Sequence, residues 1–211
     1  MNVQLSATDM TDSSTTGMVT TPYVSTFLGN RFYPLEPRID RVDIEDIAHG
    51  LAYQCRFNGQ TREFYSVAQH SLVVASLVPN DLRLAALLHD AAEAYLGDMV
   101  KPLKVLLPAF AAIEEQVSAI IAHAFDVDFT NYGPIKRADL IALATEKRDL
   151  MPHSTERWEY LDNVRPLPER IVAMQPGEAK QAFLSEFTRL RSAGARLGGP
   201  SQSARMVGSI A

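Results

Sequence analysis

The segment LLHDAAEAYLGDMVKPLK, residues 87–104, combines an apolar helical pattern with a histidine, two aspartates, a glutamate and two lysines. Leu87 and Leu88 belong to the apolar side of the pattern, and Gly97 is typical of the residue that follows a helix. We therefore predict a helix from about residue 80 to residue 96, with several polar groups close to an apolar core.

Helical spacing of apolar residues recurs on both sides of this segment, and no alternating pattern is long enough for a sheet. Asp43 is predicted to cap a helix whose apolar stripe runs from Ile44 to Cys55. Ser66 and Gln69 match a capping box at the start of another helix. Three further helices are predicted at residues 113–124, 134–150 and 176–190. The expected fold class is all-α.

Length and composition predict one domain. A chain of 211 residues with 46% hydrophobic residues can form one sizeable core. Residues 1–20 are rich in serine and threonine without periodicity, and residues 194–211 look the same. We therefore expect flexible tails at both ends and a single domain over residues 21–193.

The charge and the single cysteine exclude several function classes. A net charge of -5 without a basic patch argues against duplex nucleic acid as the main partner. No segment resembles a membrane span or a signal peptide, so we predict a cytoplasmic protein without a membrane partner. Cys55 is the only cysteine, so any metal site must use histidine and carboxylate ligands.

Three polar residues of the predicted central helix share one face. His89 lies four residues before Glu93, and Asp90 lies three before it. Burying an ionised carboxylate next to an apolar face costs free energy unless a cation balances its charge. A divalent metal would balance it. His89 and Asp90 alone leave coordination positions open, for which His70 and Asp139 are the candidates.

Each candidate also has a plainer explanation. A lone histidine near a helix start, such as His70, is more often a surface or hydrogen-bonded residue than a ligand. Asp139 could form an ordinary surface cluster with Lys136 and Arg137, and Glu93 could pair with a lysine. Periodicity alone leaves both explanations open.

The order of these residues resembles a known signature. His70, then His89 and Asp90, then Asp139, each on its own predicted helix, resemble the H…HD…D pattern of the HD-domain metal-dependent phosphohydrolases. The resemblance extends to bacterial 5′-deoxynucleotidases and compact phage-encoded dATP triphosphohydrolases. It covers Phe32 to Leu150 and implies a compact HD-domain helical bundle. The segments that carry it are RFYPLEP, DIEDIAHGLAYQCRFNG, FYSVAQHS, LLHDAAEAYLGDMVKPLK and TEKRDLM.

The resemblance implies a ligand set and roles for neighbouring residues. The implied metal ligands are His70, His89, Asp90 and Asp139, which would hold cobalt, manganese or zinc, with magnesium a further candidate alongside a triphosphate. Glu93 is implied to orient or deprotonate the attacking water, and Asp98 to assist the water or protonate the leaving group. The implied substrate-binding residues are Arg56, Phe57, Lys101 and Lys104, although Phe57 would also fit a core.

The resemblance implies an enzyme that hydrolyses deoxynucleotides with a divalent metal. The segment FLGNRFYPLEP resembles the short triphosphohydrolases, so we favour a dATP-preferring enzyme that releases deoxynucleoside and triphosphate. A 5′-deoxynucleotidase acting on deoxynucleoside monophosphates and a catalytically silent nucleotide-binding module are the alternatives. Hydrolysis of cyclic dinucleotides or (p)ppGpp is disfavoured, because the HD-GYP motif is absent. The resemblance also implies a homo-oligomer.

Overall fold

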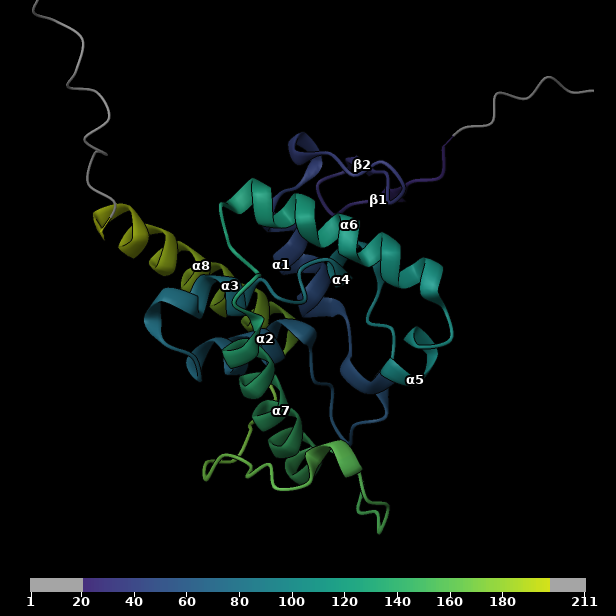
Figure 1. Ribbon diagram of the computed structural model, residues 1–211, viewed down its shortest axis with the longest axis vertical. Coiled ribbons are helices and arrows are strands. Elements are labelled where there is room, and N and C mark those ends of the chain that lie inside the picture. The colour runs from purple at the N-terminus through teal and green to yellow at the C-terminus, as the bar shows by residue number, and fades with distance from the viewer. Residues whose placement is uncertain (1–20, 198–211) are drawn as a thin grey trace, which may run out of the picture.

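The computed structural model describes residues 21–197, and these residues form a mainly helical fold, as predicted. The strands β1 (Val24–Ser25) and β2 (Arg31–Phe32) form one short antiparallel pair. In Figure 1, α6 lies beside this pair and α7 lies toward the opposite end of the molecule. The predicted N-terminal tail and residues 198–211 lie outside the described residues. Gly194, predicted to begin the other tail, instead lies inside the last helix.

The start of α1 confirms the predicted cap. α1 spans Ile44–Tyr53, and the Oδ1 of Asp43 accepts a hydrogen bond from the Glu45 amide at 2.8 Å. The predicted stripe is too long, because Cys55 lies beyond the helix and forms a β-bridge with Ser66. The buried apolar residues of α1 are Ile47, Ala48, Leu51 and Ala52.

The start of α2 confirms half of the predicted capping box. α2 spans Val67–Ser76, and the Ser66 Oγ accepts from the Gln69 amide at 3.1 Å. The Gln69 side chain does not return to Ser66. It donates to the Val172 carbonyl at 2.7 Å and accepts from the Met174 amide at 2.8 Å. These two bonds fasten a distant part of the chain to the start of α2.

The prediction of one continuous helix over residues 80–96 is wrong. The structure has η3 (Asn80–Leu82), α3 (Arg83–Leu87) and α4 (Glu93–Leu96), separated by a tight turn. The His89 Nδ1 lies 2.8 Å from the Ala86 carbonyl, which would accept from the Asp90 amide in a continuous helix. The side chain of His89 therefore competes with the helical backbone. Gly97, at φ 92°, ends α4 as predicted.

The remaining elements are α5 (Lys101–Lys104), α6 (Pro108–Phe125), α7 (Tyr132–Asp149), α8 (Pro176–Leu197), η1 (Ile39–Arg41), η2 (Arg56–Gly59) and η4 (Glu159–Leu161). α6 begins before the predicted residue 113, because Pro108 suits the first turn of a helix. α7 begins within one turn of the predicted Pro134.

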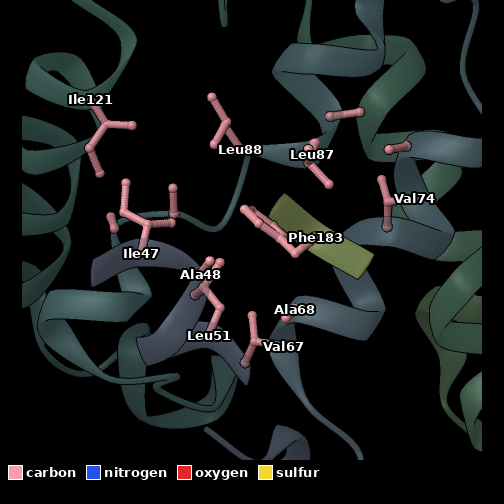
Figure 2. Packing of buried hydrophobic residues seen from close by; sticks show 14 of the residues in the cluster. Ile47, Ala48, Leu51, Val67, Ala68, Val74, Leu87, Leu88, Ile121 and Phe183 are labelled. Carbon is pink, nitrogen blue, oxygen red and sulfur yellow. The ribbon is translucent and has the colours of Figure 1, made fainter. Parts of the chain in front are cut away.

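The core lies where α1, α2, α3 and α8 meet (Figure 2). Its apolar side chains are fully buried or nearly so, and Phe183 from α8 lies among those of the other three helices. Burial of this kind supplies most of the favourable free energy of folding. The core therefore holds α2 and the segment after α3 in fixed positions, and both carry polar residues of the predicted site. The labelled core residues are Ile47, Ala48, Leu51, Val67, Ala68, Val74, Leu87, Leu88, Ile121 and Phe183.

Gly50 permits the close approach of α1 and α4. A Cβ at Gly50 would lie 2.9 Å from the Cβ of Ala94. We expect Gly50→Ala to lower the free energy of unfolding by about 1–3 kcal/mol, because α1 and α4 must separate. Urea denaturation checks this, with Gly133→Ala as the control, since a Cβ there meets nothing within 4 Å. Equal stability of the two variants would contradict the prediction.

Candidate metal centre

His70 is buried at the centre of the site. It lies on α2, where its amide donates to the Ser66 carbonyl at 3.1 Å. Its side chain is fully buried, and its Nδ1 lies 2.6 Å from the Oε1 of Glu146. With Nδ1 bonded in this way, Nε2 is the ring nitrogen left for other partners.

The structure brings together His70 from α2, His89 from the turn after α3, and Asp139 from α7. One ligand atom of each lies within 4.8 Å of the others, so this group could hold a metal ion. The Nε2 of His70 is 3.4 Å from the Oδ1 of Asp139. The Oδ2 of Asp90 lies 3.6 Å from that nitrogen and 3.1 Å from the Nε2 of His89. The group of three ligand atoms does not include Asp90, which lies beside it in contact with both imidazoles.

The residues present could hold a metal ion. The His70 Nε2 is buried and has no hydrogen-bond partner among the residues that the structure describes. An imidazole that bonds a carboxylate through Nδ1 commonly presents Nε2 to a metal. Two imidazole nitrogens and the Asp139 carboxylate form a donor set of the kind that binds metal ions, and Asp90 lies beside it.

The charges around the site keep both aspartates ionised. Burial by itself would raise the pKa of Asp90 and of Asp139, but the neighbouring histidines lower both pKa values below the usual range. Burial and the charge of Arg56 lower the pKa of His70, whereas Glu146 and Asp139 raise it, to about 9 overall. A metal ion that binds the Nε2 of His70 must therefore displace a proton at neutral pH.

Glu93 is a buried carboxylate without a clear structural task. Glu93 is the first residue of α4 and is buried. Its Oε2 has no hydrogen-bond partner within residues 21–197. Burial, followed by the charges of Asp90 and Asp98, raises the pKa of Glu93 well above its usual range. Burial likewise raises the pKa of Asp98. A carboxyl group with a raised pKa beside a candidate metal site is suited to proton transfer.

Arg56 reaches the site from the turn before α2. Its Nη2 lies 3.1 Å from the Oε2 of Glu146, and its Nη1 lies 4.0 Å from the Oδ2 of Asp90. The next two residues, Phe57 and Asn58, have left-handed φ values of 55° and 50°. Such values are uncommon for residues other than glycine and are often found at functional sites. Phe57 is only half-buried, so it does not belong to the core.

The two lysines of α5 differ in their surroundings. The Nζ of Lys104 lies 2.7 Å from the Oε1 of Glu114 on α6. Lys101 is exposed, and its Nζ lies 5.5 Å from the centre of the Tyr160 ring. Lys104 is still close enough to Glu93 for its charge to lower the pKa of that carboxyl group. A phosphate bound by Lys104 would therefore compete with Glu114.

Glu146 is the site residue that sequence reasoning missed. It belongs to the segment TEKRDLM, in which no residue received a role. Its side chain is completely buried and contacts both His70 and Arg56. Its spacing of two helical turns from Asp139 is the signal that could have identified it, since residues seven apart share a helix face. Asp139 also contacts Lys136, at 2.5 Å, which is part of the plainer explanation considered for Asp139.

Comparison with known proteins finds uncharacterized relatives. No family model matches the chain. The chain is 39% identical over 170 residues to the uncharacterized protein YfdR of Escherichia coli strain K12, covering 80% of this chain and 95% of YfdR. It is 42% identical over 120 residues to the uncharacterized protein RCAP_rcc00048 of Rhodobacter capsulatus, covering 52% of this chain and 61% of that protein. Within residues 21–197, no helix has the length and hydropathy needed to cross a membrane.

Proposed function

This chain belongs to the family of the uncharacterized Escherichia coli protein YfdR, and we propose that it is a metal-dependent hydrolase of deoxynucleotides with an HD-domain fold. The observation that carries the proposal is the buried Nε2 of His70, which lies near His89 and the ionised Asp90 and Asp139. A divalent ion bound there would lower the pKa of a bound water molecule and polarise the scissile phosphorus.

The residues around this centre have the properties that phosphate hydrolysis needs. Glu93 is suited to take the proton of the attacking water when its carboxyl group is ionised, because a raised pKa makes the carboxylate a stronger base. Asp98, whose pKa is also raised, is suited to deliver a proton to the leaving group. Arg56 holds a permanent positive charge beside Asp90 and would neutralise charge that develops on the phosphate.

A cavity along α7 has several cationic side chains in its lining. The cavity, of about 780 Å³, shares Lys136 with the contact at Asp139. Arg137 and Arg165 also line it, so it offers positive charge in a chain whose net charge is -5. Several cationic side chains can bind the additional phosphate groups of a triphosphate, which a monophosphate lacks. Together with the resemblance of FLGNRFYPLEP to the short triphosphohydrolases, this supports the proposal of a dATP-preferring triphosphohydrolase, with 5′-deoxynucleotidase activity as the alternative.

Separation of products by anion exchange tests this proposal. The protein is incubated with Co²⁺ or Mn²⁺ and with each of dATP, dGTP, dAMP and ATP. Deoxyadenosine together with intact triphosphate is the expected result from dATP. Hydrolysis of dAMP alone would identify a 5′-deoxynucleotidase, and stepwise release of orthophosphate from dATP would refute triphosphate removal. Nucleotide binding without turnover would support the silent binding module.

Lys104 is expected to contribute to binding of the phosphate chain. Lys104→Ala should weaken inhibition by inorganic triphosphate about tenfold and leave inhibition by deoxyadenosine nearly unchanged, because a charge-assisted hydrogen bond is lost. Glu114→Gln is the matched variant with the opposite expected sign, since it releases Lys104 from its 2.7 Å partner. Inhibition constants for the two compounds check both variants. Equal weakening of both inhibitors by Lys104→Ala would remove its assigned role.

A further inference from the structure

We propose that Glu146 is a positioning residue with two tasks: it orients His70, and it holds Arg56 away from Asp90. The inference rests on the proposed metal site and adds a residue that the H…HD…D pattern does not include. Glu146 would contact neither the metal nor the substrate. It would instead determine whether the ligands and the phosphate-binding arginine stand in their working positions.

The first task follows from the contact with His70. The Oε1 of Glu146 lies 2.6 Å from the Nδ1 of His70, and both side chains are completely buried. Among the residues that the structure describes, Glu146 is the hydrogen-bond partner of the His70 ring. A carboxylate at Nδ1 keeps the proton on that nitrogen once a metal is bound, so Nε2 presents its lone pair. It also fixes the rotation of the ring.

The second task follows from the position of Arg56 between two carboxylates. Its guanidinium lies 3.1 Å from the Oε2 of Glu146 and 4.0 Å from the Oδ2 of Asp90. Arg56 is largely buried, with 11% of its side chain exposed, so it requires an anionic partner. Without Glu146, the other carboxylate within ion-pair distance is Asp90, a proposed ligand. An Arg56–Asp90 pair would compete with the metal for the same oxygen atoms.

Affinity for the metal alone tests both tasks without any substrate. Titration calorimetry with Mn²⁺ is expected to show that Glu146→Gln lowers the affinity by about 10–100-fold, as for other residues that support metal ligands. Glu146→Asp keeps the charge but is too short for both contacts, so its affinity should lie between those of Glu146→Gln and the unmodified chain. Asp149→Asn removes a carboxylate from the same helix, where Asp149 pairs with Arg148, and should leave the affinity unchanged.

A double-variant cycle separates positioning from a merely structural role. Arg56→Gln should increase Mn²⁺ affinity much more in the Glu146→Gln background than in the unmodified chain, because there Arg56 has lost its 3.1 Å partner and can approach Asp90 more closely than 4.0 Å. Equal effects in the two backgrounds would overturn the second task. A Mn²⁺ affinity of Glu146→Gln equal to that of the unmodified chain would overturn the first task.

Folding is monitored by circular dichroism, and Glu146→Asp replaces Glu146→Gln in the cycle if the latter unfolds. Failure of this inference and failure of the proposed function give different results. A chain that binds Mn²⁺ with the expected pattern but hydrolyses no nucleotide would refute the function and retain the role of Glu146. A chain that binds no divalent ion would overturn the inference.

Discussion

Asp90→Asn is expected to abolish turnover and to lower the affinity for Co²⁺ or Mn²⁺ by more than about 100-fold, a greater loss than a supporting residue causes. The variant keeps the shape of the side chain but removes the negative charge that lies 3.1 Å and 3.6 Å from the two histidines. A neutral amide is a poor ligand for the proposed ion.

Metal content after dialysis and steady-state turnover of dATP check the Asp90→Asn prediction. Asp162→Asn is the matched control, because Asp162 forms an exposed ion pair with Arg157 instead of contacting the site. The control should retain both metal and turnover. Full metal content together with unchanged turnover in Asp90→Asn would refute the proposed site.

Glu93→Gln is expected to reduce kcat by about 10²–10⁴-fold and to leave metal affinity nearly unchanged, because it removes the group that accepts a proton and no ligand. The same variant should unfold at a slightly higher temperature than the unmodified chain. Burial and the charges of Asp90 and Asp98 disfavour an ionised Glu93, and glutamine carries no charge. A gain in stability with a loss of turnover is the expected pattern for a functional group in an unfavourable environment.

Single-turnover kinetics, metal titration and thermal unfolding check the Glu93→Gln prediction. Loss of metal in this variant would show that Glu93 is a ligand, and the mechanism would then need to be redrawn. Undiminished kcat would exclude Glu93 as the proton acceptor. The Glu146 variants provide the contrasting pattern, since they are expected to lose metal affinity first.

Local features of the chain explain which elements could be predicted. The caps at Asp43 and Ser66 were predictable because their oxygen atoms bond amides only two and three residues away. The interruption at His89 is also local, but the apolar periodicity continues through it and conceals it. Periodicity predicts which face of a helix is buried. It does not predict that the His89 imidazole forms a hydrogen bond with the Ala86 backbone carbonyl.

The candidate site shows the same division. The residue types and their order indicated His70, His89, Asp90 and Asp139 as possible ligands. Their meeting at one place depends on the packing of α2 and α7 and on the turn after α3. The partners of the positive charges were not predictable, because Arg56 and Glu146 are 90 residues apart in the chain. The spacing of Lys104 and Glu114 likewise indicated no contact.

The sequence by itself determined the helical class, the capped helix starts at Asp43 and Ser66, and the chemical types available for a metal site, because propensity, capping and periodicity act over a few residues. Only the tertiary structure decided which of these groups are buried and which atoms face one another. Burial and distance control the charge of Glu93, the orientation of His70 and the position of Arg56. These quantities depend on contacts between distant segments, which no local pattern contains.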